Sequence, residues 1–289
     1  MTNALYLPDL LWEPIIKTAL YEDLGTGGDV TTQALLSEPT KRIKACFKAR
    51  QKGIIAGLPG ARLTFQLLNK DCEFHYVKQD GDIIMPGDII ARIEGPPEAI
   101  LGGERVALNL LSHLSGIASI TAIIQREVQS CNVGICCTRK TLPGLRALQK
   151  YAVRAGGGRN HRHRLDDAIM LKDNHIALLG SDIATALKLA RQRAGHLMKI
   201  ELEVDNLEQL ETALLHGGAD AYLLDNMSAS MLRRAVKMVN NRAITEASGG
   251  ITPHNAREIA ETGVNILSLG WLTHSVNALD IGLDFLPLS

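Results

Sequence analysis

The sequence predicts an α/β fold, in which an N-terminal α+β module precedes a barrel-like series of strand–helix units. Two observations support this prediction. After residue 130, short apolar runs recur and each is followed by a stretch of helical periodicity, which is typical of parallel strands buried on both faces. The first hundred residues instead contain short β-like runs separated by Asp-Gly and Pro-Gly turns.

The N-terminal module combines helical and strand patterns. Apolar residues have helical spacing over 9–21 and 59–69. Residues 41–49 (KRIKACFKA) alternate polar and apolar, as a half-buried strand does. Three further β-like runs follow between residues 72 and 95, with the sequences CEFHYV, IIM and IIARIEG.

A long helix is expected to follow this module. Apolar residues recur at helical spacing from Glu104 to about Val128, which predicts one long helix or two consecutive ones. The most apolar window, Gly116 to Ile124, is interrupted by polar residues and is too short to cross a bilayer, so we expect no membrane span.

The second half of the chain contains six predicted strands and five predicted helices. The strands are 133–137, 168–171, 198–204, 221–224, 243–247 and 264–269. The helices are about 144–155, 181–193, 206–216, 228–239 and 253–262. Six units are somewhat short of the eight in a closed barrel, and two smaller strands could come from unassigned segments.

Composition and charge exclude several classes of protein. Hydrophobic residues make up 46% of the 289 residues, which excludes a disordered or fibrous chain. Lys plus Arg and Asp plus Glu both number 31, and a net charge of zero argues against binding nucleic acid or an anionic membrane. The N-terminus lacks the pattern of a signal peptide, and five cysteines without CxxC spacing indicate free thiols in a reducing cytoplasm.

Polar or glycine residues lie at the ends of nearly all the predicted parallel strands. Catalytic groups of (β/α) barrels lie at the carboxyl ends of the strands, and the last two loops often bind phosphate. Loops of this kind are polar in any barrel, but six such ends at one rim indicate a site. Five ends contribute Thr138, Arg139, Lys140, Lys172, Asp225, Ser248, Gly249, Gly250 and Gly270, with Leu269 directly before Gly270, and the remaining strand contains Glu201 and Glu203.

A basic segment lies between Thr138 and Arg164, within an acid-free stretch over 128–165. In a neutral chain this local positive field suits a small polyanion, because the planar guanidinium binds carboxylate and phosphate bidentately. One part of the segment has the i, i+4, i+8 spacing of a solvated helix face: Arg146, Lys150 and Arg154. The other part lies at a strand end and in a loop after three glycines: Arg139, Lys140, His161 and Arg162.

An acidic patch is expected opposite the basic segment. Glu201 and Glu203 are two apart on one strand, so both should point into the barrel. Two buried like charges are costly unless a cation, a metal or a substrate hydroxyl balances them. With Asp225 on the next strand, the patch suits the hydroxyls of a sugar phosphate and a divalent cation. The segment Ser248-Gly249-Gly250 predicts either a phosphate cradle or a plain tight turn.

Several of these motifs resemble the quinolinate phosphoribosyltransferase family. The segments that carry the resemblance are TRKTLPGLRALQKYAV with the following AGGG and NHR, LDDAIMLKDNH, LLDNM, SGGI, LTHSV, EDLGTGGDVTT and ERVALNLLSHLSGIA. They cover essentially the whole chain. The resemblance implies an N-terminal α/β sandwich domain (1–115, with about 275–289 packing on it) and an incomplete, seven-stranded (β/α) barrel (116–274).

The resemblance also implies an activity. Members form nicotinate mononucleotide, carbon dioxide and pyrophosphate from quinolinate and 5-phosphoribosyl-1-pyrophosphate with Mg²⁺, in NAD synthesis. They are homodimers, and the partner's N-terminal domain closes the active site. A cytoplasmic enzyme that binds neither nucleic acid nor membrane is therefore expected.

Family positions map onto residues of this sequence. The implied quinolinate-binding residues are Arg105 (from the partner subunit), Arg139, Lys140, His161, Arg162 and Lys172. The implied ribose- and magnesium-side acids are Glu203 and Asp225, with Glu203 preferred to Glu201 because it lies nearer the rim. The phosphate loops map to Ser248, Gly249, Gly250 and Gly270, and we expect Lys140, Lys172, Glu203 and Asp225 to be catalytic.

Two points remain open. Lys172 either orients the substrate or protonates the ring carbon. Trp271 follows Gly270 where the family pattern predicts a small residue, usually Ala, so the indole either reshapes the phosphate contact or packs outside the rim.

Three other functions are compatible with parts of the sequence. Lys172 could form a Schiff base, as in a class I aldolase, although the many arginines argue against it. A phosphoribosyltransferase for another aromatic acid is a closer alternative. VKQDGDIIMPGDIIARIEG resembles biotinyl and lipoyl carrier hairpins, but Ile84, Met85 and Pro86 occupy the tip where a carrier needs a lysine.

Overall fold

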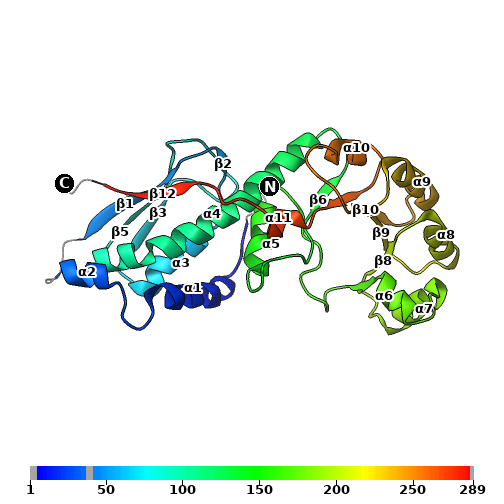
Figure 1. Ribbon diagram of the computed structural model, residues 1–289, viewed down its shortest axis with the longest axis horizontal. Coiled ribbons are helices and arrows are strands. Elements are labelled where there is room, and N and C mark those ends of the chain that lie inside the picture. Colours follow the sequence, from blue (N-terminus) through cyan, green and yellow to red (C-terminus); the bar gives the residue numbers. More distant parts are fainter. Residues whose placement is uncertain (1–4, 37–41, 287–289) are drawn as a thin grey trace. The chain divides into compact units, whose positions relative to one another are not determined.

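The computed structural model describes residues 5–36 and 42–286, which divide into two compact units (Figure 1). The sheet unit comprises Met1–Ala122, Thr141–Gly157 and Leu272–Ser289, and the barrel unit comprises Ile123–Lys140 and Gly158–Trp271. The chain therefore passes from one unit to the other after Ala122, Lys140, Gly157 and Trp271. The predicted barrel domain over 116–274 therefore differs from the structure, in which the segment 141–157 belongs to the sheet unit.

The sheet unit contains a four-stranded antiparallel sheet in the order β12-β1-β5-β3. Its strands are β1 (Ile43–Ala49), β3 (Glu73–Tyr76), β5 (Ile89–Gly95) and β12 (Ile281–Phe285). A separate pair joins β2 (Gly53–Ile54) to β4 (Ile83–Ile84). The last described strand of the chain therefore pairs with the first, with Ala45 opposite Phe285.

Helices α3 and α4 pack on this sheet (Figure 1). Their core includes an aromatic cluster in which the ring of Phe47 lies 6.0 Å from that of Phe65 and 5.7 Å from that of Phe74. Full burial of one such side chain stabilises a fold by about 2–3 kcal/mol. The helices of the unit are α1 (Asp9–Leu24), α2 (Val30–Leu35), α3 (Leu58–Leu68) and α5 (Arg146–Ala155), with most of α4 (Pro97–Glu127) and of α11 (Trp271–His274).

The returning segment is anchored in the sheet unit through α5. The hydroxyl of Tyr151 donates to Asp80 Oδ2 at 2.6 Å, and its ring lies edge-on to Trp12. Asp80 also accepts from the backbone N–H groups that open α3. A Cβ on Gly156 would collide with the carbonyl of Ala118, so only glycine allows this close approach. The predicted solvated helix face is wrong at Lys150, which is fully buried.

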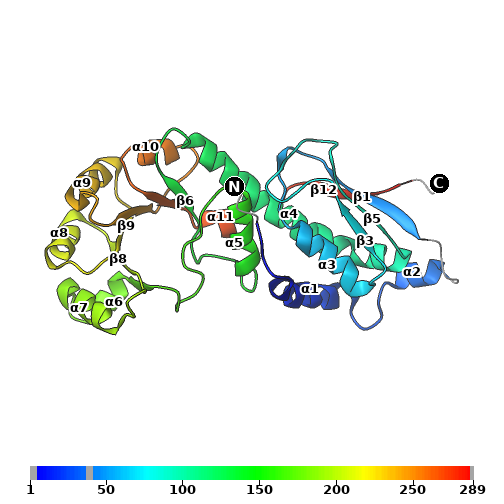
Figure 2. The same cartoon turned by 180° about the vertical axis from the view of Figure 1, so that it is seen from behind.

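The barrel unit is built on a six-stranded parallel sheet in the order β6-β11-β10-β9-β8-β7. The strands are β6 (Gly134–Cys136), β7 (Ile169–Leu171), β8 (Ile200–Val204), β9 (Ala221–Asp225), β10 (Ile244–Ser248) and β11 (Ile266–Ser268). Helices lie around the outside of these strands (Figure 2). They are α6 (Asp173–Ala177), α7 (Ile183–Arg193), α8 (Leu207–His216), α9 (Ala229–Val239) and α10 (Ala256–Ala260).

The structure confirms the α/β class, with an antiparallel unit and a parallel, barrel-like unit. The number of barrel strands is six among the described residues rather than the implied seven. A single parallel bridge between Cys136 and Arg159 lies on the free side of β6, in the place of a seventh strand. The chain pairs there for one residue only, after Gly157 at φ +86°, and then continues as a loop toward His161.

The parallel register arranges inward-facing side chains in rows. At the carboxyl ends, Asp225 pairs with Ser248 and Ser248 with Ser268. One row deeper, two residues earlier on each strand, Glu203 pairs with Leu223 and Leu223 with Glu246. Glu201 lies one row deeper again. Because residues two apart share a face, all these rows point to the same side of the sheet.

Helix α4 corrects the expectation that the apolar stretch over 116–124 is too short to cross a bilayer. This stretch is part of a longer apolar helix, whose 31 residues are long and apolar enough to cross a membrane by length and composition. In the structure 56% of its most apolar window is buried in protein, and core helices of soluble proteins pass the same test.

Candidate active site

A cavity of about 330 Å³ opens at the carboxyl ends of the barrel strands. The strands contribute Met170, Glu203, Leu223, Asp225, Glu246, Ser248 and Ser268. The connecting segments contribute Thr138, Arg139, Lys140, His161, Arg162 and Lys172. Residues far apart in the sequence therefore meet in one pocket inside the barrel unit.

Two arginines form a basic wall of this pocket. The Nε atoms of Arg139 and Arg162 are buried, and neither has a hydrogen-bond partner within the described chain. Arg162 is held in place by its Nη1, which donates to the carbonyl of Ala168 at 2.8 Å. Burial, and then the charge of Arg139, lower the pKa of Arg162. Two guanidinium groups with spare donors favour a ligand that carries carboxylates.

Lys172 and Glu203 form an ion pair on another wall. Nζ of Lys172 contacts Oε2 of Glu203, whose side chain is only 14% exposed. The backbone N–H of Lys172 donates to Nδ1 of His175 at 3.1 Å, which fixes the start of α6 directly after β7. Asp225, at the end of β9, accepts from Nδ2 of Asn226 at 2.7 Å.

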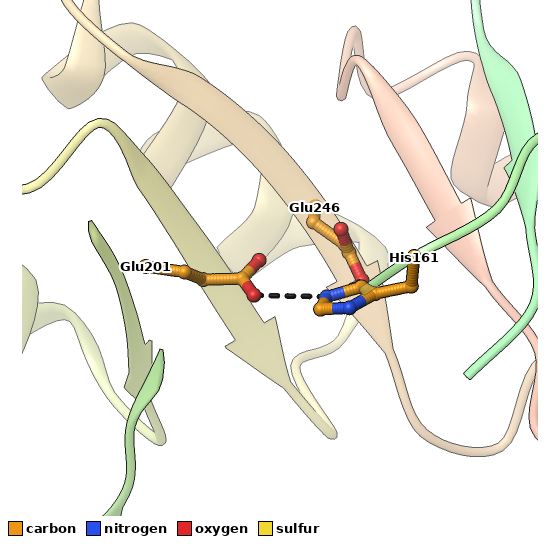
Figure 3. A group of neighbouring side chains, drawn as sticks. All are labelled: His161, Glu201 and Glu246. Atoms are coloured by element: carbon orange, nitrogen blue, oxygen red, sulfur yellow. Dashed lines mark hydrogen bonds and ion pairs between the residues drawn. The ribbon is translucent and has the colours of Figure 1, made fainter. Parts of the chain in front are cut away.

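Three titratable side chains meet at the base of the pocket: His161, Glu201 and Glu246 (Figure 3). His161 Nε2 lies 2.9 Å from Glu201 Oε2 and 3.7 Å from Glu246 Oε1. His161 Nδ1 accepts from the backbone N–H of Arg162 at 2.8 Å, so the ring proton is on Nε2. Burial, and then the charge of Glu201, raise the pKa of Glu246 to about 7.

The loop after β10 presents backbone donors. Three carbonyl oxygens accept hydrogen bonds: that of Ser248, which ends β10, from Asn226 N at 2.9 Å, and in the loop those of Gly250 from Asn255 Nδ2 at 2.9 Å and Ile251 from Trp271 Nε1 at 2.7 Å. The N–H groups of residues 249–251 have no acceptor in the described parts of the chain. Free successive amides beside glycines at positive φ form a concavity suited to an anion, and Gly249 and Gly250 have φ of +91° and +62°.

The predicted site residues fall into three groups. Thr138, Arg139, Lys140, His161, Arg162, Lys172, Glu203, Asp225 and Ser248 line the pocket. Gly249, Gly250 and Gly270 lie in the adjoining loops, and a Cβ on Gly270 would meet Lys140 Cδ at 2.8 Å. Three residues do not line the pocket: Glu201 hydrogen-bonds to His161, Leu269 is buried, and Arg105 lies on α4 in the sheet unit, where its side chain is 63% exposed.

Two lining residues, Glu246 and Ser268, were missed as candidates. Glu246 is two residues before Ser248, so it faces the same side of β10. A charged residue inside an otherwise uncharged buried strand was the available signal. Unlike Glu201 and Glu203, which lie two apart on one strand, Glu246 is a single charge and forms no repeated pattern in the sequence.

Comparisons with known proteins agree with this geometry. The family model described as quinolinate phosphoribosyl transferase, C-terminal domain, matches residues 117–284, and the N-terminal domain model matches 29–115. A probable nicotinate-nucleotide pyrophosphorylase [carboxylating] from Bacillus subtilis is 48% identical over 91% of this chain and 89% of its own. The chloroplastic nicotinate-nucleotide pyrophosphorylase [carboxylating] of Arabidopsis thaliana is 38% identical over 93% of this chain and 81% of its own.

A solved structure extends the likeness to the fold. NadC from Streptococcus pyogenes superposes with a TM-score of 0.91 at 38% identity, covering 98% of this chain and 99% of the other. Sequence, fold and both domain models thus agree, and the chain belongs to the quinolinate phosphoribosyl transferase family.

Proposed function

We propose that this chain is a carboxylating nicotinate-nucleotide pyrophosphorylase. It converts quinolinate and 5-phosphoribosyl-1-pyrophosphate to nicotinate mononucleotide, carbon dioxide and pyrophosphate in NAD biosynthesis. One observation supports this function above the others. Arg139 and Arg162 have buried guanidinium donors without partners, in the same cavity as the carboxylates of Glu203 and Asp225.

Quinolinate is bound on the basic wall. Its two carboxylates match the spare donors of Arg139 and Arg162, because guanidinium–carboxylate pairs are charge-assisted and directional. Lys172, aligned by Glu203, orients the ring. The ring nitrogen then attacks the anomeric carbon of the ribose, and holding both substrates in one cavity reduces the entropic part of the barrier.

The phosphoribosyl group lies on the acidic and glycine-rich side. Glu203 and Asp225 are placed to bind ribose hydroxyls and to stabilise the oxocarbenium-like charge that develops as pyrophosphate leaves. The free amides of residues 249–251 bind the phosphate. Thr138, Lys140 and Gly270 line the same rim.

The carboxylates of Glu203 and Asp225 fit a Mg²⁺ ion that arrives bound to the substrate's phosphates. Glu203 is paired with Lys172 and Asp225 with Asn226, so the two carboxylates alone do not form a preformed metal site. Mg²⁺ commonly keeps water ligands and binds through substrate phosphates with one or two carboxylates. When bound, it supplies charge neutralisation for the departing pyrophosphate.

We further propose a cytoplasmic homodimer. Arg105 is 63% exposed on α4 and is the residue that a partner subunit would contribute to quinolinate binding. Two alternatives are disfavoured. Lys172 is engaged by Glu203 rather than poised as a Schiff-base amine, and Lys78 is paired with Asp88 at 3.1 Å in the hairpin that resembles a carrier module.

The test is incubation of the protein with quinolinate, 5-phosphoribosyl-1-pyrophosphate and Mg²⁺, with nicotinate mononucleotide followed by absorbance and mass. A parallel reaction replaces quinolinate with nicotinic acid. We expect product from quinolinate alone. Product from neither acid, with folded protein, would contradict the proposal and favour another aromatic acid as the acceptor.

A further inference from the structure

The proposed reaction needs a proton donor inside the pocket. When carbon dioxide leaves, the bond between its carbon and the ring carbon beside the nitrogen breaks, and the electron pair stays on the ring carbon. Nicotinate mononucleotide carries a hydrogen there, so a C–H bond must form with a proton from an acid. Positioned acids of this kind typically contribute about 10²–10⁴ in rate.

The structure assigns this role to Glu246, an inference that rests on the function proposed above. Its side chain faces the pocket from β10, one row below Ser248. It is 3% exposed, and its Oε1 is a buried oxygen without a hydrogen-bond partner in the described chain. A carboxylate in that position would repel a dicarboxylate substrate, whereas a carboxylic acid offers it an O–H donor.

The other polar groups of the pocket are less suited to deliver the proton. Arg139 and Arg162 do not deprotonate in proteins. The ammonium of Lys172 is held by Glu203, which makes it an orienting group. The Nε2–H of His161 points at Glu201 (Figure 3).

The surroundings of Glu246 favour its protonated form. Burial and the carboxylate of Glu201 raise its pKa, and Cys137 adds to this effect, whereas His161 and a hydrogen bond with Ser268 lower it. An arriving quinolinate dianion adds negative charge and favours the acid further. The remaining charged groups lining the pocket are Arg139, Lys140, Arg162, Lys172, Glu203 and Asp225.

The proton given up by Glu246 is accounted for in each turnover. Glu246 gives its proton to the ring carbon and becomes a carboxylate 3.7 Å from Nε2 of His161, which stabilises it. Water restores the proton when product leaves. The cluster is not arranged as a metal site, because Nδ1 of His161 accepts from the backbone N–H of Arg162 and the proton on Nε2 is directed at Glu201.

The reverse of this step can be measured without carbon dioxide. Wild-type protein, nicotinate mononucleotide and pyrophosphate are incubated in D₂O, and exchange of the ring hydrogen beside the nitrogen is followed by NMR. We expect Glu246→Gln, which keeps the shape but has no acidic proton, to slow both exchange and product formation about 100-fold. Glu246→Asp should recover part of the rate, and Glu258→Gln on α10, outside the pocket, should match wild type.

A second readout does not depend on any variant folding. In the exchange direction Glu246 must be a carboxylate, so the wild-type exchange rate should rise through about pH 7 and then level off. A flat profile, or a Glu246→Gln protein that exchanges and turns over at the wild-type rate, would overturn the assignment. The proposed function would stand in both cases, because it is tested by wild-type product formation alone.

Discussion

Trp271 donates its indole N–H to the carbonyl oxygen of Ile251 at 2.7 Å. Trp271 follows Gly270, and Ile251 follows Gly249 and Gly250, so one hydrogen bond joins the two loops proposed to bind phosphate. Trp271 does not line the pocket, but its side chain contributes to the loop beside it. Its indole engages the carbonyl oxygen of Ile251, and the backbone N–H groups of residues 249–251 are left free to bind a ligand.

Replacing Trp271 with Phe keeps an aromatic ring and removes the donor. Loss of a neutral hydrogen bond is worth about 1 kcal/mol, so KM for 5-phosphoribosyl-1-pyrophosphate should rise about fivefold. KM for quinolinate should stay within twofold, as measured by steady-state kinetics with each substrate varied in turn. Trp12→Phe is the matched control, since Trp12 lies in the sheet unit. Equal changes in both constants would contradict a role at the phosphate loop.

Arg162→Ala and Arg139→Ala should act on the other substrate. Each removes a charge-assisted donor worth about 1.5–3 kcal/mol, which predicts a rise of about 10- to 100-fold in KM for quinolinate. KM for 5-phosphoribosyl-1-pyrophosphate should change far less. Arg164→Ala is the control, because Arg164 is exposed and pairs with Asp166. If both substrates were affected alike, neither arginine would be specific to quinolinate.

Glu246→Gln should stabilise the protein at alkaline pH. The folded-state pKa of Glu246 is raised from 4.5 to about 7, so its contribution is present below pH 4.5 and is lost as pH rises through 7. At pH 8 the buried carboxylate costs on the order of 3 kcal/mol, which Gln removes. Urea unfolding at pH 5 and pH 8 measures this, and a gain of the same size at both values would refute it.

Asp220 should have the opposite dependence. Burial raises its pKa, but hydrogen bonds from Lys199 and Arg191 outweigh burial and lower it to about 2. Its contribution is therefore present above pH 4 and is lost as pH falls toward 2. Asp220→Asn should cost about 2 kcal/mol in the free energy of unfolding at pH 7 and only a small part of that, about 0.4 kcal/mol, at pH 2. A cost independent of pH would mean that packing, not charge, explains the effect.

Much of the barrel unit could be predicted because its signals are local. Buried parallel strands appear as apolar runs, and Asp225 and Ser248 end two of them, so the rim was visible in the sequence. Short elements such as α2, α6, α11 and β2 have too few residues for a periodic pattern.

Long-range contacts explain the other omissions. The burial of Lys150 follows from the return of α5 to the sheet unit, which no local pattern indicates. That Glu201 hydrogen-bonds to His161 and does not line the pocket could be seen only once the loop carrying His161 was placed against β8. The proton on Nε2 of His161 likewise depends on the fold of the loop.

The pairing of β1 with β12 has a consequence for synthesis of the chain. β1 leaves the ribosome early, but its partner is made only at the C-terminus, which at about 5–20 residues per second takes on the order of tens of seconds. During this interval one edge of β1 is unpaired, and an open edge is a template for aggregation. The unit that begins first is therefore completed last, and a nascent or truncated chain that lacks β12 is the form most in need of a chaperone.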